Sequence, residues 1–452
     1  MSRASRWDHP GGPPPRRGRL TAAQGTALYV TAVLGTGVIA LPALAARVAG
    51  PASLVAWLLL VLMSAPLALS FAALGARHPD AGGVSTYARL AFGDRCAAVV
   101  GWCFYLAVPT GIAAAALFCG SYVAAAVGGG RLTTSVTAVV LVAVGASTNA
   151  FGLRLVGPVQ LLLAALLVTL LILAVALSLP HASTDNLQPF APHGWPAIGA
   201  AAAMLIWSFA GWEAITHLAG EFRHPERDIQ RATWAAVVVV GLLYLLLALA
   251  VITVLGPDAH RGDAPLAELM RRGMGDHARP LAAFAAVLLT LGSANAYIAG
   301  AAGLGSALAR HGALPSWLAR GGRAGEVPRR SLAVVSLLTA LSLGAVVVTG
   351  AGAEPLVHLT NGSLVAVYVA GSAAAVRLLP RGTHGHRAAV VSLVAVVLLL
   401  LASGPYLLWP LAVTAATLLY LRLRGNRPSI VERESDRAAK GSRAEDIRAK
   451  DS

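Results

Sequence analysis

Hydrophobic residues occur along this chain in long runs, and short segments between the runs hold most of the charged residues. A run of roughly 20 apolar residues is the length of helix that crosses a hydrocarbon core about 30 Å thick. The pattern therefore predicts an all-α polytopic membrane protein with twelve transmembrane helices and two short surface helices. The expected spans are 21–50, 51–76, 96–127, 132–149, 157–179, 195–218, 232–255, 280–308, 331–349, 355–378, 388–402 and 406–423, and the short helices are 84–92 and 265–274.

Composition and the position of the charges support a membrane location. The chain is 57% hydrophobic and 12% charged, whereas a soluble domain carries about 25% charged residues. A net charge of +15 would suggest nucleic acid in a soluble protein. With twelve spans, however, 29 of the 35 Lys and Arg residues fall on the side that holds both termini. Since cytoplasmic loops are enriched in these residues, we expect cytoplasmic termini and no nucleic-acid partner.

Three parts of the chain are expected to differ in structure. Residues 1–20 form a cytoplasmic tail without the features of a signal peptide, residues 21–423 form the membrane domain, and residues 424–452 form a charged, disordered cytoplasmic tail. The cysteines all fall in one apolar run, where small packing residues are expected rather than a disulfide or a metal site. They are Cys96, Cys103 and Cys119.

The first expected span contains residues that interrupt a helix. Gly35 and Gly37 flank Thr36, and Pro42 follows. Glycine tolerates non-helical backbone, and proline removes a helical hydrogen bond. Irregular backbone at membrane depth is tolerated where it is buried in protein or lines a cavity, so the interruption indicates a binding site. The alternative is a contact between helices through small residues.

The sixth expected span contains a second interruption, at residues 208–211. Glu213 follows it and is the only acidic residue well inside any expected span. A carboxylate at that depth is by default a functional hypothesis, and His217 lies one helical turn further on the same face. The alternative is a buried structural pair that holds the broken helix in place. Breaks five spans apart are what an inverted five-helix repeat would produce.

Six short motifs follow one another along the expected spans and loops. They are Gly35-Thr36-Gly37-Val38, Pro79-Asp80-Ala81-Gly82-Gly83, the segment Trp207 to Glu213, the loop Glu221 to Ala232, the segment Ser293 to Ile298 and the loop Ala309 to Pro315. In these motifs the sequence resembles the amino acid–polyamine–organocation transporter superfamily over residues 21–423, and within it bacterial exporters of methionine and branched-chain amino acids. The resemblance implies five-plus-five inverted repeats at about 21–180 and 195–379, with broken helices 1 and 6 and two extra helices at 386–423.

The resemblance also implies roles for residues at the breaks. The N–H groups of Thr36 and Gly37, next to Gly35, would bind a substrate carboxylate. The carbonyl groups of Val33, Trp207 and Ala210 would accept hydrogen bonds from the α-ammonium. The Trp207 indole would cover the substrate, and Tyr297 would stand at an aromatic gate, although a packing role is an equal alternative for Tyr297.

The driving ion is open between proton and sodium. Several members of the superfamily use a lysine in the fifth span, but the only lysines here are Lys440 and Lys450 in the tail. Ser293 is a candidate sodium ligand, and Glu213 and His217 are candidates for carrying protons, since histidine titrates near neutral pH. Proton coupling is the favoured hypothesis. Asn295, in the same motif as Ser293, completes the candidate coupling and gating residues.

Three functions compete. The first is efflux of neutral apolar amino acids (methionine, leucine, isoleucine and valine) by a monomer or homodimer in a bacterial cytoplasmic membrane, without a cofactor or metal. The second is an antiporter or importer of another amino acid or a polyamine, for which Glu213 is the one available acid. The third is a membrane-embedded enzyme or a channel. We expect no enzyme, because no nucleophile–base pair or metal-ligand set occurs in the spans beyond Glu213 and His217.

Overall fold

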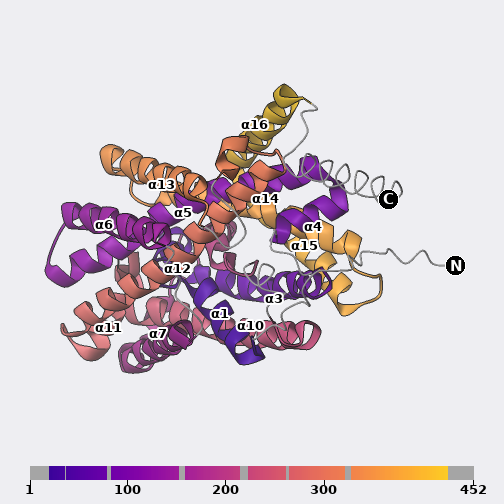
Figure 1. The fold of residues 1–452 in the computed structure, drawn as a ribbon. Helices are drawn as coiled ribbons and strands as arrows, with labels where there is room; N and C mark the ends of the chain where they lie inside the picture. Colours follow the sequence, from indigo (N-terminus) through magenta and orange to yellow (C-terminus); the bar gives the residue numbers. More distant parts are fainter. Residues whose placement is uncertain are drawn as a thin grey trace, which may run out of the picture.

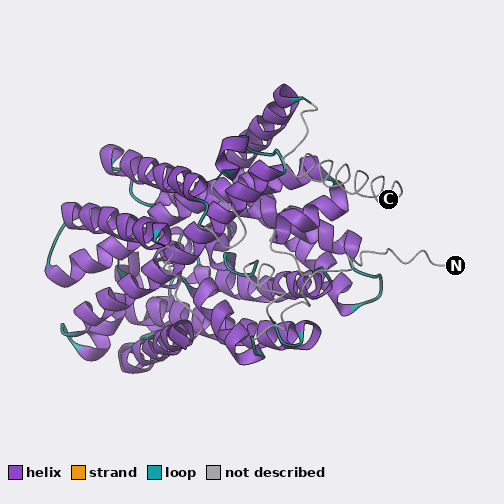
Figure 2. Cartoon of the chain, viewed as in Figure 1, coloured by secondary structure: helices purple, strands orange, loops and turns teal. Residues whose placement is uncertain are grey.

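The computed structural model is a bundle of helices, and Figure 2 shows helices joined by short loops. Within the described part of the chain, regular secondary structure is entirely helical, apart from an isolated bridge between Leu20 and Phe222. The described residues are 20–35, 37–78, 83–151, 158–213, 222–260, 264–320 and 327–425. Thr36, residues 79–82 of the second motif, His217 and the tail after Gly425 lie outside them.

The helices follow the expected spans closely. The first half of the chain forms α1 (Ala22–Leu34), α2 (Gly37–Ala49), α3 (Ser53–Arg77), α4 (Gly83–Phe92), α5 (Asp94–Val127), α6 (Arg131–Ala150) and α7 (Pro158–Ser178). The second half forms α8 (Ala197–Leu205), α10 (Pro225–Ala250), α11 (Pro265–Met274), α12 (Ala278–Arg310), α13 (Arg329–Thr349), α14 (Glu354–Leu378), α15 (His384–Ala402) and α16 (Leu408–Arg424).

Local sequence explains where several helices begin and end. At the start of α1, the Thr21 hydroxyl accepts a hydrogen bond from the Gln24 N–H at 3.4 Å, and the Gln24 side chain accepts one from the Thr21 N–H at 3.0 Å. This reciprocal pair satisfies two N–H groups that have no partner within the helix. At the end of α5, Gly128 has φ 68° and adopts the left-handed conformation that commonly ends a helix.

Eight helical segments in the described residues are long and apolar enough to cross a membrane. Three shorter apolar helices, at 22–34, 165–181 and 197–208, overlap the first, fifth and sixth expected spans. The first and sixth are short because each span is interrupted. The chain is therefore a polytopic helical protein, and the total of twelve spans stays a prediction.

Helix α5 lies at the centre of the bundle. It packs against α6, α12, α13 and α14, and Figure 1 shows these helices around it. In the most apolar stretch of α5, 83% of the residues are buried. A Cβ atom at Gly120 would lie 2.3 Å from the carbonyl oxygen of Thr134, so the bare glycine lets α5 and α6 approach closely, as small residues do between membrane helices.

Contacts between the two halves of the chain are reciprocal. Helix α3 packs against α10, α5 against α12, and α6 against α13. The short helix α4 rests on α5 and α14, while its counterpart α11 rests on α12 and α7. A pseudo-two-fold axis between two five-helix units would produce such matching contacts. The inverted repeat and its boundaries stay predictions.

One tyrosine links three helices. The Tyr122 hydroxyl in α5 donates a hydrogen bond to the Ile39 carbonyl of α2 at 2.6 Å and accepts one from the Leu266 N–H at the start of α11 at 2.9 Å. Both groups are buried, and the N–H lies in the first turn of α11, where it has no partner within the helix. Tyr122 therefore fixes the short helix α11 to the second half of the interrupted first span.

Candidate functional site

The first span is interrupted where the sequence predicts. Helix α1 ends at Leu34, and Gly35 leaves the helical path with φ 31° and ψ −144°. Helix α2 begins at Gly37 and continues through Pro42. The first N–H groups of α2 have no helical partners and carry the positive end of its dipole. The start of α2 is therefore suited to bind a carboxylate.

The sixth span is interrupted as well. Helix α8 ends at Leu205 and passes into a 3₁₀ turn over Ile206–Phe209, after which Ala210 adopts φ −57° and ψ 124°. The carbonyl groups at the end of α8 are partly satisfied from outside. The Asn361 side chain of α14 donates to the carbonyl oxygens of Ala203 at 3.1 Å and Met204 at 2.9 Å.

The two breaks touch directly. A Cβ atom at Gly211 would lie 2.7 Å from the Ala32 carbonyl carbon and 2.8 Å from the Val33 nitrogen. Gly211 also has φ 116°, a conformation that is essentially restricted to glycine. Only glycine therefore allows the backbone of the sixth span to meet that of the first.

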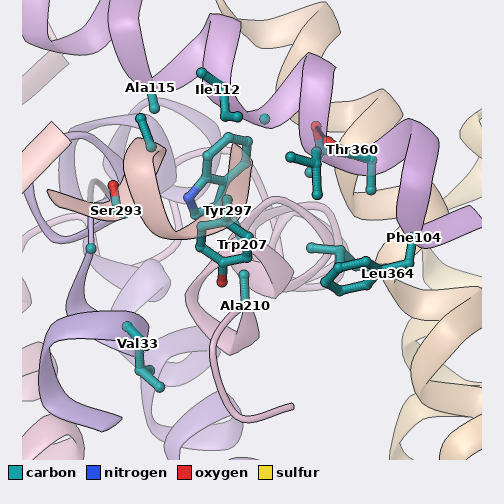
Figure 3. A pocket seen from close by; sticks show the side chains of 17 residues that line it. Val33, Phe104, Ile112, Ala115, Trp207, Ala210, Ser293, Tyr297, Thr360 and Leu364 are labelled. Atoms are coloured by element: carbon teal, nitrogen blue, oxygen red, sulfur yellow. Dashed lines mark hydrogen bonds between the residues drawn. The ribbon is translucent and has the colours of Figure 1, made fainter. Parts of the chain in front are cut away.

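A cavity of about 590 Å³ lies between the breaks and helices α5, α12 and α14. Figure 3 shows Trp207 and Tyr297 near its middle, with Val33, Ser293 and Thr360 around them. No charged side chain lines the cavity among the described residues, and its wall is mostly apolar. The lining residues are Ala32, Val33, Gly35, Gly37, Phe104, Ala107, Val108, Gly111, Ile112, Ala115, Trp207, Ala210, Ser293, Ala294, Tyr297, Thr360 and Leu364.

Seven of the residues singled out in the sequence meet around this cavity, although they come from three separate segments of the chain. Their roles in binding or coupling stay predictions. They are Val33, Gly35, Gly37, Trp207, Ala210, Ser293 and Tyr297.

The Trp207 indole lies between α2 and α5. Its Cδ1 atom is 3.1 Å from the position of a Cβ at Gly37, and its Cη2 atom is 3.6 Å from that of a Cβ at Gly111. Its ring also packs edge-on against Phe118, with centroids 6.4 Å apart. The two glycines leave room for the large ring, and a movement of Trp207 would change the shape of the cavity.

Two of the carbonyl groups expected to accept from an ammonium already accept one hydrogen bond each. The Tyr244 hydroxyl of α10 donates to the Val33 carbonyl at 2.8 Å, and the Ala210 N–H donates to the Trp207 carbonyl at 3.0 Å. A carbonyl oxygen has two lone pairs and can accept a second hydrogen bond. The Tyr297 hydroxyl is buried and has no hydrogen-bond partner among the described residues.

The buried carboxylate of Glu213 lies outside the cavity lining. One of its oxygens accepts from the Gly211 N–H and from the Tyr368 hydroxyl of α14, each at 3.0 Å. These bonds hold the turn of the sixth span against α14. The alternative of a structural pair with His217 and the role of Glu213 in coupling both stay predictions.

Asn295 is not among the residues that line the cavity. Its side-chain oxygen accepts hydrogen bonds from the Asn149 amide at 2.6 Å and the Thr148 hydroxyl at 3.2 Å, both from α6. In this structure Asn295 therefore joins α12 to α6, and the gating role expected for it stays a prediction.

Several residues of the site were not singled out from the sequence. Asn361 and Tyr368 hold the sixth-span break from α14, and Thr360 contributes a polar group to the cavity, its hydroxyl 2.7 Å from that of Thr110. A polar Thr360-Asn361 pair within an apolar span was the available signal. Phe104 and Ile112 on α5 gave no signal, because one apolar residue in an apolar helix resembles the next.

The described residues contain no group of three or more His, Cys, Asp or Glu side chains that could hold a metal ion. The three cysteines are free, and Cys103 and Cys119 are buried in α5.

Comparison with known proteins gives consistent matches. A family model described as amino acid permease matches residues 20–422. An uncharacterized amino acid permease of Bacillus subtilis, YecA, is 32% identical over 406 residues, which cover 90% of this chain and 96% of that protein.

Two further relatives have names that state a substrate. The L-methionine/branched-chain amino acid exporter YjeH of Escherichia coli is 35% identical over 238 residues, covering 50% of this chain and 54% of the exporter. The branched-chain amino acid permease BcaP of Bacillus subtilis is 24% identical over 240 residues, covering 49% of this chain and 51% of the permease.

Proposed function

Because the chain belongs to the amino acid permease family, we propose that it is a secondary active transporter that exports neutral apolar amino acids. The apolar cavity between the two helix breaks is the observation that carries this proposal. The described lining offers apolar surface to a side chain and no charge to pair with one. The family membership makes the chain a multi-pass membrane protein, and we place it in the bacterial plasma membrane with both termini in the cytoplasm.

The two ends of an amino acid find complementary groups at the breaks. Its carboxylate would lie at the start of α2, near Thr36 and the Gly37 N–H, where the helix dipole favours negative charge. Its ammonium group would lie near the carbonyl groups of Val33, Trp207 and Ala210. Backbone binds the part that all amino acids share, so the remaining cavity wall is left to select the side chain.

The apolar wall of the cavity supports methionine, leucine, isoleucine and valine as substrates. Small-molecule sites are mostly apolar, with a few polar groups that fix the orientation of the ligand, and most of the residues that line this cavity are apolar. A polyamine or a cationic amino acid is the second candidate. It is disfavoured because burying an unpaired ammonium is costly, and the described lining contains no carboxylate.

Transport would proceed by rocking of two inverted five-helix units around this site, with helices 11 and 12 added at the end of the membrane domain. The reciprocal packing of α4 and α11 supports this arrangement. We propose a proton as the driving ion, with sodium bound near Ser293 as the alternative. Export as the direction rests on the likeness to the exporter of Escherichia coli.

Exchange in proteoliposomes tests the substrate and the site. Vesicles loaded with leucine should take up labelled leucine and valine, and a pH gradient should drive net movement where a sodium gradient does not. Trp207→Ala should abolish exchange, because Trp207 lines the cavity. Trp195→Ala is the matched control, since its side chain is 67% exposed and lies outside the cavity.

Two results would count against this proposal. If methionine, leucine, isoleucine and valine neither move nor compete, the substrate class is wrong. If Trp207→Ala exchanges leucine as well as Trp195→Ala does, the cavity is not the transport site.

A further inference from the structure

One turn of α14, residues 360–364, serves both the cavity and the break in the sixth span. Thr360 and Leu364 line the cavity and lie four residues apart, on one face of the helix; Figure 3 shows both of them at the cavity wall. Asn361 donates its amide hydrogens to two carbonyl groups at the end of α8. The position of this turn therefore sets part of the cavity wall and helps to hold the break.

The chain at the start of α16 contacts the same turn of α14. The Trp409 indole N–H donates a hydrogen bond to the Ser363 hydroxyl at 3.0 Å, and Ser363 is 0% exposed. A Cβ atom at Gly362 would lie 3.0 Å from the Tyr406 carbonyl oxygen, in the 3₁₀ turn before α16. The Tyr406 ring also stacks on the His358 ring of α14, with centroids 3.8 Å apart. Three separate contacts therefore join this part of the chain to α14.

These contacts lie outside the cavity. With 3.6 residues per helical turn, Gly362 is about 160° around the helix from Thr360 and from Leu364. Neither Ser363 nor Trp409 lines the cavity, and no described residue of α15 or α16 does so. The start of α16 therefore supports the cavity wall from behind, without contact with the space that a substrate would occupy.

The Trp207 indole shows which end of the cavity this wall closes. Its Cδ1 atom is 3.1 Å from the position of a Cβ at Gly37, where α2 begins. A Cβ at Gly111 would lie 3.6 Å from the Cη2 atom at the other end of the indole and 3.4 Å from the Thr360 Cγ2 atom. Thr360 thus lies at the far end of the indole from the start of α2. A substrate with its carboxylate at α2 would reach Thr360 only with its side chain.

We propose that Trp409 is a positioning residue for this transporter. By its hydrogen bond to Ser363 it fixes the turn that carries Thr360 and Leu364, and so it influences which side chains the cavity accepts. This inference rests on the proposed function, since it requires the cavity to be the transport site. A turn that is free to move must be ordered when a substrate binds, and the cost of ordering weakens binding. Loss of the Trp409–Ser363 bond should weaken binding most for side chains that reach the wall.

Trp409→Phe removes the N–H donor and keeps an aromatic ring. In proteoliposomes it should raise the KM for leucine exchange about fivefold, the worth of one net hydrogen bond. It should raise the KM for valine less, and the maximal rate per folded transporter should stay unchanged. Ser363→Ala should have the same effect, and the double variant should have no larger effect than either single one. Trp317→Phe, at a side chain that is 45% exposed and outside the cavity, is the matched control and should change neither KM.

Gly362→Ala tests the contact between the backbone before α16 and the same turn. The added methyl carbon would lie 3.0 Å from the Tyr406 carbonyl oxygen and 3.3 Å from the Pro410 Cδ atom, so it must separate α16 from the turn. Exchange of leucine relative to valine should fall by up to about tenfold, the worth of one methylene group in an apolar pocket. Gly344→Ala in α13, where a Cβ would meet no atom within 4 Å, is the control and should keep the original ratio.

The proposal is overturned if Trp409→Phe has the KM values of Trp317→Phe, or if it raises the KM for leucine and for valine equally, as a general loss of structure would. It is also overturned if Gly362→Ala keeps the leucine-to-valine ratio of Gly344→Ala. If Trp409→Phe does not fold, Ser363→Ala supplies the same comparison.

Trp207→Ala separates this inference from the proposed function. Both are overturned if Trp207→Ala still exchanges leucine, or if the unaltered protein does not exchange it. If the unaltered protein exchanges leucine, Trp207→Ala does not, and Trp409→Phe behaves as its control does, the inference alone is overturned.

Discussion

Gly211→Ala perturbs the point at which the two helix breaks meet, and it adds a single methyl group. In the structure, that methyl carbon would lie 2.7 Å from the Ala32 carbonyl carbon and 2.8 Å from the Val33 nitrogen. Both atoms belong to backbone, so the neighbour cannot move aside by rotating a side chain. The substitution must separate the two breaks or distort one of them.

Two terms set the size of the effect. Holding a non-glycine residue at φ 116° costs about 1–3 kcal/mol. Forcing an extra carbon into a packed contact costs about 1–3 kcal/mol. Together they predict a loss of stability of about 2–6 kcal/mol, which is a large part of the about 5–15 kcal/mol that holds a typical domain folded.

The assay is thermal unfolding of the purified protein in detergent, with leucine binding measured on the folded fraction. Gly300→Ala is the control, because a Cβ at Gly300 in α12 would meet no atom within 4 Å. It should leave stability unchanged or raise it by about 0.4–1 kcal/mol, since alanine restricts the unfolded chain more than glycine does.

Equal melting temperatures for Gly211→Ala and Gly300→Ala would refute the reasoning, because the close contact between the breaks would then be absent. Normal leucine binding by a clearly destabilised Gly211→Ala would refute a narrower point, namely that this contact shapes the cavity.

Other parts of the structure give further predictions. Asn361→Leu should lower the melting temperature by an amount equivalent to about 1–3 kcal/mol, because the carbonyl groups at the end of α8 lose their donor; an unchanged value would mean that water replaces it. Tyr122→Phe should cost a similar about 1–3 kcal/mol and increase proteolysis at α11, since the α11 N–H loses its acceptor; unchanged proteolysis would contradict the link. Gly111→Ala should reduce leucine exchange more than valine exchange by about 1 kcal/mol of discrimination, because the methyl group enters the cavity; an equal reduction would contradict the side-chain assignment. On α11, the hydrogen bond from Arg271 lowers the pKa of Glu268 below its ordinary value of about 4.5. The stability that this bond adds is therefore present above about pH 4.5 and is lost as the pH falls below it. The melting temperature of Glu268→Gln should change less with pH than that of the unaltered protein, and identical pH profiles would show that the pair adds nothing.

Sequence patterns predicted the interruptions because their causes are local. Gly35 and Gly37 free the backbone whatever surrounds them, and the structure ends α1 at Leu34. The short helix at residues 265–274 was likewise predicted with its observed bounds, since it lies between two apolar runs and has its own polar face. The amino acid permease family is confirmed by the match over residues 20–422.

Long-range partners could not be predicted in the same way. The four-residue spacing in the sixth span predicted a contact between Glu213 and His217, which lies outside the described residues. The structure shows the Tyr368 hydroxyl of α14 as a hydrogen-bond partner of Glu213. Asn295 shares a motif with Ser293, yet the Asn295 side chain bonds to α6 whereas Ser293 lines the cavity. A span that is apolar on all sides has no polar face to show how the helix is rotated about its axis. Which of its residues face the cavity therefore depends on packing between helices.

The central position of α5 has a consequence for how the protein is made. Of the eight apolar segments, the one in α5 has the largest buried share, 83%. It is nevertheless synthesised long before most of the helices that cover it. Helix α14 starts more than two hundred residues after α5 ends. At about 5–20 residues per second, the ribosome needs roughly 10–50 s to reach it. During that time the alanine and glycine surface of α5 lies against lipid or the insertion machinery, so a nascent chain stalled before α12 would be an easy target for membrane proteases.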